Sequence, residues 1–233
     1  MVILAVDTCL EPGSLALQEE DSPPEVVPLP PGWRSTTVQE AMALLLARHG
    51  LTTRDIAGYG VTTGPGSFTG VRIGLTVVKA LAEVHNRPIV AVSTLEMLAA
   101  AARDANPGNP SAALAPILDA RRGQIFGAVY QAKDDGFQPI VEATVCSLGS
   151  FLKQIRGREL PDLRFCGTNL APFVSEIEKA GWEAAAVLRV SPSLAGVLAQ
   201  ITVARLRKGM GVSALAVDAN YVRASDAELF WKE

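Results

Sequence analysis

The sequence predicts an α/β fold that is duplicated, with two lobes of mixed sheet and helices. The first observation is a repeat: an apolar strand pattern ending in aspartate, a glycine-containing turn and a second strand pattern occur at 3–18 and again at 112–131. The second observation is that helix and strand patterns alternate after each copy. Such alternation is typical of α/β domains, and recurrence of the whole unit indicates internal duplication.

The segment 106–111, NPGNPS, separates the two copies. Proline, glycine and asparagine clustered between periodic segments are typical of linkers. A chain of 233 residues is long enough for two small lobes. We therefore expect an N-terminal lobe at 1–105 and a C-terminal lobe at 111–233.

In the N-terminal half, the apolar runs 1–7 and 14–20 are expected to be strands. Five prolines at 23–31 exclude a central strand there, so 26–29 is at most a poor edge strand. Hydrophobic periodicity and capping residues predict the remaining elements. These are helices at 36–49, 69–84 and 94–104, and strands at 57–63 and 87–93.

The C-terminal half repeats the strand–turn–strand pattern and then alternates again. Strands are expected at 112–120, 124–131, 137–146 and 163–167, and helices at 148–156, 170–180 and 193–208.

Composition excludes several classes of function. The net charge of −3 is unlike the basic surface of a protein that grips nucleic acid by itself. Three widely spaced cysteines without a CxxC pair indicate reduced thiols in a cytoplasmic protein, and two histidines argue against a multi-histidine zinc site. We therefore expect no metal site. We also expect no signal peptide. No membrane span is expected either, because no apolar run approaches about 20 residues.

Four glycines between Gly64 and Gly74 raise the question of a phosphate site. The P-loop pattern fails because no lysine follows the last glycine. The dinucleotide pattern G-x-G-x-x-G also fails, because Thr69 stands where the third glycine belongs.

Two interpretations of this loop stay open. Amides at a helix N-terminus attract anions, and Asp7 and Thr8 end a strand where a metal–nucleotide site can lie, so these two residues with Gly64 and Gly66 are candidate nucleotide ligands. Alternatively, the glycines serve a tight turn that needs positive φ, and the aspartate caps its own turn. No catalytic residue is predicted, because no G-x-S-x-G elbow and no histidine base accompany a nucleophile.

The helix at 69–84 has only a thin polar stripe. Its polar residues recur at spacings of three and four, and nearly every other position is apolar or glycine. The helix at 36–49 contains the seven-residue apolar run AMALLLA. Either the chain's own fold covers both helices, or a second chain covers one side, and glycines four apart would let another helix approach closely.

Five motifs, in order along the whole chain, resemble the TsaB (YeaZ) family. They are ILAVDT at 3–8, GPGSFTGVRIG at 64–74, VSTLEMLA at 92–99, DARRGQIF at 119–126 and YVR at 221–223. The resemblance implies an actin/Hsp70-like (ASKHA, ribonuclease H-like) fold of two lobes. It also implies a place in threonylcarbamoyladenosine modification of tRNA, at the adenosine beside the anticodon in tRNAs that read codons beginning with A.

In this family the larger relative TsaD carries the metal and performs the transfer, and its metal-binding histidine pair has no counterpart here. The resemblance therefore implies a non-catalytic subunit with no cofactor of its own. It would bind and activate TsaD, with TsaE as a third component, and would form homodimers when alone. ATP and a divalent metal are expected on the partner subunits, and tRNA is expected to be met only within the complex.

The resemblance favours a second chain as the cover of the two apolar helices. The predicted partner interface is Met42, Leu45, Leu46, Thr69, Gly70, Arg72, Ile73, Gly74, Thr76, Val77 and Ala80.

The chain departs from the family pattern twice. The family usually has a His–Ser pair where this chain has Arg34, Ser35 and Thr36, and a proline where it has Ala219. The alternative function is an independent actin-like ATPase or kinase that uses Asp7 and the glycine loop. A glycoprotease-type peptidase is the least favoured, because neither metal ligands nor a catalytic triad are found.

Overall fold

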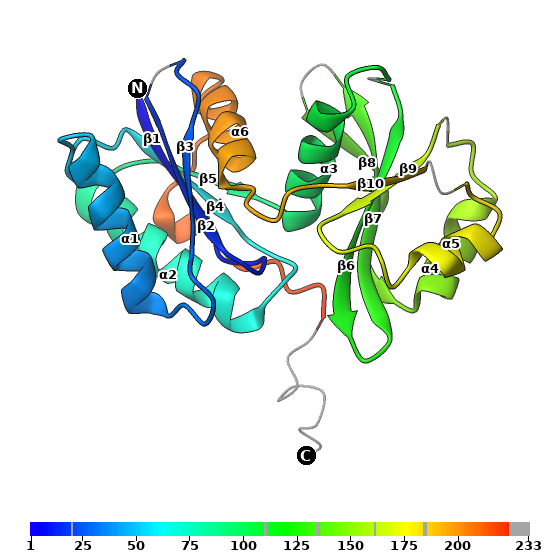
Figure 1. Ribbon diagram of the computed structural model, residues 1–233. Coiled ribbons are helices and arrows are strands. Elements are labelled where there is room, and N and C mark those ends of the chain that lie inside the picture. The colour runs from blue at the N-terminus through cyan, green and yellow to red at the C-terminus, as the bar shows by residue number, and fades with distance from the viewer. Residues whose placement is uncertain (20, 110, 134–135, 161, 184–185, 224–233) are drawn as a thin grey trace. The chain divides into compact units, whose positions relative to one another are not determined.

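The computed structural model describes residues 1–19, 21–109, 111–133, 136–160, 162–183 and 186–223. Residues 224–233 of the predicted C-terminal lobe lie outside the described part of the chain. Two five-stranded mixed sheets form the centres of two compact units (Figure 1).

The first sheet has the strand order β3-β2-β1-β4-β5. Its strands are β1 (Val2–Asp7), β2 (Ser14–Glu19), β3 (Glu25–Pro28), β4 (Gly58–Thr62) and β5 (Ile89–Val92). β2 runs antiparallel to β1 and β3, whereas β4 runs parallel to β1 and β5. The proline-containing strand β3 lies at the edge of the sheet, as predicted, where its missing amide breaks no ladder.

The second sheet repeats the first. Its strands are β6 (Ala113–Arg121), β7 (Gln124–Lys133), β8 (Gly136–Cys146), β9 (Arg164–Gly167) and β10 (Val187–Arg189), in the order β10-β9-β6-β7-β8. β6 to β10 occupy the positions that β1 to β5 hold in the first sheet, in that order, and neighbouring strands have the same antiparallel and parallel pairings. The prediction of a duplicated two-lobe α/β fold is therefore confirmed.

All six predicted helices form. They are α1 (Ser35–Arg48), α2 (Phe68–His85), α3 (Thr94–Ala105), α4 (Leu148–Arg156), α5 (Val174–Lys179) and α6 (Ala195–Arg207), followed by the short 3₁₀ helix η2 (Ala214–Ala216). α5 is shorter than predicted, because 170–173 form a turn in which the Phe173 amide donates to the Leu170 carbonyl at 2.9 Å. The three-residue strand β10 carries too short a pattern to be predicted.

Packing divides the chain differently from the predicted ranges 1–105 and 111–233. The first unit holds Met1–Thr94 and Pro192–Asn220, and the second takes Leu95–Ser191 together with the described residues from Tyr221 onward. The last helix of each half thus belongs to the other half's unit. α6 packs on β1, β2 and β4, and its Thr202 hydroxyl lies 2.1 Å from where a Cβ on Gly60 would stand. The predicted ranges differ from these units because a linker pattern in the sequence gives no information on which sheet a distant helix packs against.

This division predicts which sheet loses amide protection when a cavity is made in α6. Leu198 is fully buried, so Leu198→Ala should cost about 2–5 kcal/mol and lower amide protection in β1, β2 and β4, measured by hydrogen exchange. The matched control is Leu152→Ala in α4, which should lower protection in β7 and β8 instead. Loss of protection in the second sheet after Leu198→Ala would contradict the assignment of α6.

Candidate partner-binding surface

The start of α2 lies directly against the end of β1. The Thr8 hydroxyl donates to the Gly70 carbonyl at 2.7 Å, and the Ser67 amide donates to the Cys9 carbonyl at 3.0 Å. Thr8 and Cys9 pack on Gly66, Gly70 and Gly74, and we call this packing the strand-end contact. Its consequence is that β1 fixes both the position and the direction of α2.

The strand-end contact requires three of the four glycines. A Cβ on Gly66 would stand 2.5 Å from the Cys9 carbonyl oxygen, and one on Gly70 would stand 1.9 Å from the Thr8 carbonyl oxygen. A Cβ on Gly74 would stand 2.3 Å from the Thr8 hydroxyl. The close approach predicted for these glycines is therefore made to the chain's own strand β1.

The fourth glycine of the loop has a different role. Gly64 has φ +104°, a backbone conformation that L side chains rarely adopt. Its carbonyl accepts from the Thr94 amide at 2.9 Å.

The candidate nucleotide residues come together at this place, but most of their polar groups bond to other residues of the chain. Asp7 and Thr8 are fully buried, and the Thr8 hydroxyl is used by α2. The Ser67 hydroxyl caps α2 by accepting from the Gly70 amide at 3.1 Å, which occupies one of the amides that an anion would need. The geometry thus matches the interpretation as a tight turn.

Asp7 is the buried carboxyl group of this region. Its Oδ1 accepts from the Thr62 hydroxyl at 2.8 Å and from the Cys9 amide at 3.0 Å. Its Oδ2 has no hydrogen-bond partner among the described residues. Burial raises the pKa of Asp7 to about 6, although the hydrogen bonds from Thr62 and Cys9 act in the opposite direction.

The two apolar helices lie side by side on the first sheet (Figure 1). Six of the predicted interface residues lie in the unit's own core: Met42, Leu45, Leu46, Gly70, Gly74 and Val77. They pack on the sheet and are not available to a partner at the surface. Of the others, Thr69, Arg72, Thr76 and Ala80 are exposed and Ile73 is half-buried.

Part of the exposed side of these helices is nevertheless apolar, beside exposed charged residues such as Glu40 and Glu83. Leu44 on α1 is 66% exposed and Val84 on α2 is 76% exposed, values that are high for such side chains. We call the exposed residues Ala43, Leu44, Ala47, Thr76, Ala80 and Val84, with half-buried Ile73, the α1–α2 face. Sequence reasoning missed Leu44 and Val84, although Val84 follows Thr76 and Ala80 at steps of four, which place it beside the polar stripe.

The polar stripe of α2 is partly engaged within the chain. The Lys79 ammonium donates to the Val217 carbonyl at 2.6 Å, which ties α2 to the segment after η2. The Arg72 guanidinium lies over the Phe68 ring, 3.8 Å from its centroid.

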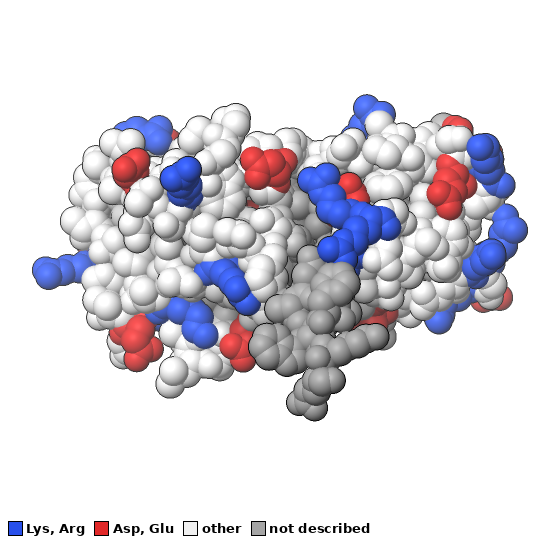
Figure 2. All heavy atoms as spheres, turned by 90° about the horizontal axis from the view of Figure 1, so that it is seen from below, with Lys and Arg blue, Asp and Glu red and all other residues white. Residues whose placement is uncertain are grey.

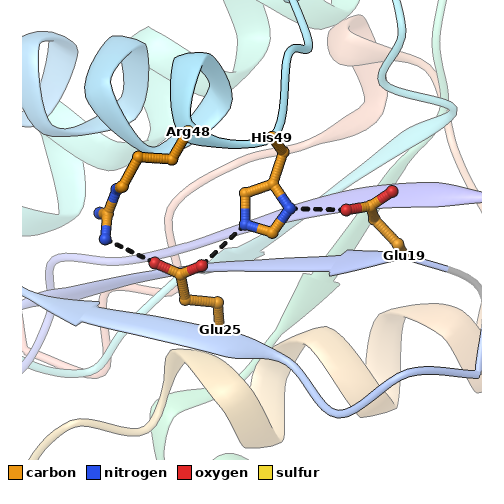
Figure 3. Close-up of polar contacts among 4 residues, drawn as sticks. All are labelled: Glu19, Glu25, Arg48 and His49. Atoms are coloured by element: carbon orange, nitrogen blue, oxygen red, sulfur yellow. Dashed lines mark hydrogen bonds and ion pairs between the residues drawn. The ribbon is translucent and has the colours of Figure 1, made fainter.

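A charged cluster holds the end of α1 on the sheet edge (Figure 3). His49 Nδ1 lies 2.6 Å from a Glu19 oxygen on β2, and His49 Nε2 lies 2.7 Å from a Glu25 oxygen on β3. Arg48 pairs with the other Glu25 oxygen at 2.6 Å. Hydrogen bonds to Glu25 and Glu19 raise the pKa of His49, and the bond from His49 lowers the pKa of Glu25. When His49 is protonated, both ring nitrogens donate, and the cluster links the helix that carries Leu44 to β2 and β3.

The described residues hold no group of three or more His, Cys, Asp or Glu side chains placed to bind a metal ion. Within the same residues, no helix has the length and hydropathy needed to cross a bilayer. Positive and negative side chains are interspersed over much of the face seen in Figure 2, in keeping with a net charge of −3.

Gly70→Ala tests the strand-end contact. The added methyl group meets backbone rather than a flexible side chain, so we expect a loss of about 1–3 kcal/mol in the free energy of unfolding, measured by denaturant titration. Gly108→Ala is the control, because among the described residues no atom beyond its chain neighbours lies within 4 Å of an added Cβ, and it should change stability by less than about 0.5 kcal/mol. Equal effects of the two substitutions would contradict the constraint.

Asp7→Asn tests the burial of the carboxyl group. Because burial raises the pKa of Asp7 from 3.8 to about 6, the native state binds more protons than the unfolded chain between these pH values, and stability falls as pH rises from 3.8 to about 6. Asparagine does not titrate and keeps an oxygen for both Oδ1 bonds. The stability of the variant relative to the wild type should therefore rise by on the order of 3 kcal/mol between pH 3.5 and 7, measured by urea unfolding. A stability difference between variant and wild type that does not change with pH would contradict the raised pKa of Asp7.

A family model described as TsaD, tRNA N6-adenosine threonylcarbamoyltransferase, matches residues 34–223. The "tRNA threonylcarbamoyladenosine biosynthesis protein TsaB" of Bacillus subtilis (strain 168) is 35% identical over 164 residues, which cover 70% of this chain and 69% of the relative. The protein with the same description from Escherichia coli (strain K12) is 35% identical over 136 residues, 58% of each chain.

A solved structure has the same fold. YeaZ from Pseudomonas aeruginosa superposes with a TM-score of 0.75 at 24% sequence identity, over 94% of this chain and 99% of that one. The match covers both duplicated units and supports the two-lobe assignment.

Proposed function

The chain belongs to the TsaB (YeaZ) family, and on this premise we propose that it is a non-catalytic dimerisation and activating subunit in the biosynthesis of threonylcarbamoyladenosine in tRNA. It acts by binding the catalytic subunit TsaD, with TsaE as a further component. The observation that carries the proposal is the apolar α1–α2 face, which the unit itself leaves uncovered.

The composition of the α1–α2 face suits a protein partner. Leu44 and Val84 would each contribute about 1–2 kcal/mol if a second chain removed them from water. Ala43, Ala47 and Ala80 are small, so another helix can approach closely between the larger side chains. A surface built from two adjacent helices accommodates two further helices, whether they come from TsaD or from a second copy of this chain.

Two features support a role without catalysis of its own. The residues that end β1 are committed to the strand-end contact, as the Thr8 hydroxyl shows by donating to Gly70. Within the described residues, no cluster of ligand side chains is placed to bind a metal. The transfer step and its cofactors are therefore assigned to the partner subunits in this proposal.

Charge on the α1–α2 face tests the proposal. Leu44→Glu with Val84→Glu should leave the fold intact, because both side chains are largely exposed, and should weaken binding to TsaD at least tenfold, since hot-spot losses of 2 kcal/mol or more are common at the centre of an interface. Titration calorimetry with TsaD and light scattering of the chain alone are the measurements.

Met210→Glu is the matched control, because Met210 is also an exposed apolar residue but lies outside the α1–α2 face. It should leave TsaD binding unchanged. The two variants are then compared in a threonylcarbamoylation assay with TsaD, TsaE and tRNA. A double variant that binds TsaD and supports modification as well as the wild type would exclude this face as the contact.

A further inference from the structure

The turn between β6 and β7 has an unusual backbone for its sequence. Arg121, Arg122 and Gly123 have φ values of +63°, +56° and +69°, so three consecutive residues lie in the left-handed region. Two-residue hairpin turns of this kind favour Asn-Gly or Asp-Gly, because these residues reach positive φ at low cost. An arginine in this region is disfavoured by its Cβ.

Both arginines of this turn lie at the surface. The Arg121 side chain is 87% exposed, and Arg122 is also exposed. Among the described residues, nothing lies within 4 Å of a Cβ built on Gly123. At an exposed position of this kind, the charged head group is the property that distinguishes arginine from asparagine.

The corresponding turn of the first unit provides an internal comparison. Asp7 ends β1 and accepts from the amide two residues on, at 3.0 Å, and Asp119 near the end of β6 does the same for Arg121 at 2.7 Å. After Asp7 the chain continues into buried Cys9 and Leu10, which pack in the first unit. After Asp119 it continues into two exposed arginines. Both aspartates thus cap their own turn, but the turns differ in length, because Asp7 pairs with Ser14 on the next strand whereas Arg121 pairs with Gln124.

A third arginine reinforces the positive charge from below the turn. Arg223 donates through Nη1 to the Ala120 carbonyl at 2.7 Å, bonds through Nη2 to Gln124, and lies 5.8 Å from the Phe126 ring centroid. The nearby carboxylate of Asp119 lies 3.8 Å from the Arg121 guanidinium. Arg121 thus lies beside the Asp119 carboxylate, and Arg223 is bonded to the same hairpin.

We propose that this arginine turn (Arg121, Arg122 and Arg223) binds the phosphate backbone of the tRNA substrate once the chain is part of its complex. The inference rests on the proposed function, which supplies RNA as the substrate. Guanidinium groups match phosphate oxygens in a bidentate geometry, and a rigid hairpin presents them without further loss of entropy. With a net charge of −3, the chain adds a local contact to an affinity supplied mainly by other subunits.

The test replaces the arginines by a residue that suits the turn better. Arg121→Asn with Arg122→Asn should raise the melting temperature by about 1–3 °C per substitution, because asparagine tolerates positive φ. The same variant in complex with TsaD and TsaE should bind unmodified tRNA transcript about fivefold more weakly for each lost phosphate contact at 0.15 M salt, with a shallower salt dependence. Fluorescence anisotropy over a salt series measures both.

The matched control carries the same change of charge away from the turn, as Arg54→Asn with Arg158→Asn, both exposed. It should leave tRNA affinity close to the wild-type value. Equal losses in the two double variants would overturn the inference, as would unchanged affinity in the turn variant. Weaker TsaD binding with unchanged tRNA affinity would reassign the turn to a protein contact.

The outcome is separable from that of the proposed function. If the wild-type chain fails to bind TsaD, the proposed function fails, and anisotropy of the chain alone at low salt still tests the turn. If TsaD binds normally but the turn variant binds tRNA as tightly as the wild type, the inference fails and the proposed function stands.

Discussion

The close packing of α2 on the end of β1 is the constraint on which the rest of the first unit depends. Gly70 and Gly74 present no side chain toward Thr8, so the helix begins in van der Waals contact with the strand. Its direction is then set by β1 rather than by a flexible loop. Everything that α2 exposes, including Val84 some four turns later, inherits its position from this contact.

The same contact separates two uses of one architecture. In open α/β sheets, ligands commonly bind outside the carboxyl ends of the strands, where helix amides point outward. Here two polar groups at that place are engaged within the chain, because the Ser67 hydroxyl caps the helix and the Thr8 hydroxyl bonds to it. Burial raises the pKa of Asp7 to about 6. A fold suited to nucleotides can thus serve as a rigid support for an interaction surface.

Sequence reasoning recovered what is local and missed what is long-range. Hydrophobic periods and caps identified the six α-helices α1 to α6 of the described residues, and the repeat around Asp7 and Asp119 identified the duplication, because both signals lie within short segments. The exchange of α3 and α6 between units was missed, since which sheet a helix covers is decided by tertiary packing. The glycines of α2 were predicted to admit a second helix, but in the structure they admit Thr8 of the same chain, because a small residue permits close approach without specifying the neighbour. Apolar positions alone also could not separate core Leu45 from exposed Leu44.

Duplication explains why the two strand-end turns are so different. A domain built twice has two equivalent hairpins, but the first one here is buried beneath α2 and constrained by Gly66 and Gly70. The second hairpin is free of that packing, so its sequence can change without loss of core contacts. Arg121 and Arg122 in left-handed conformation then carry a local backbone cost at an exposed position. A repeated fold in which one copy supplies rigidity and the other carries an exposed, locally unfavourable charge is consistent with a subunit whose contacts are completed only by its partners.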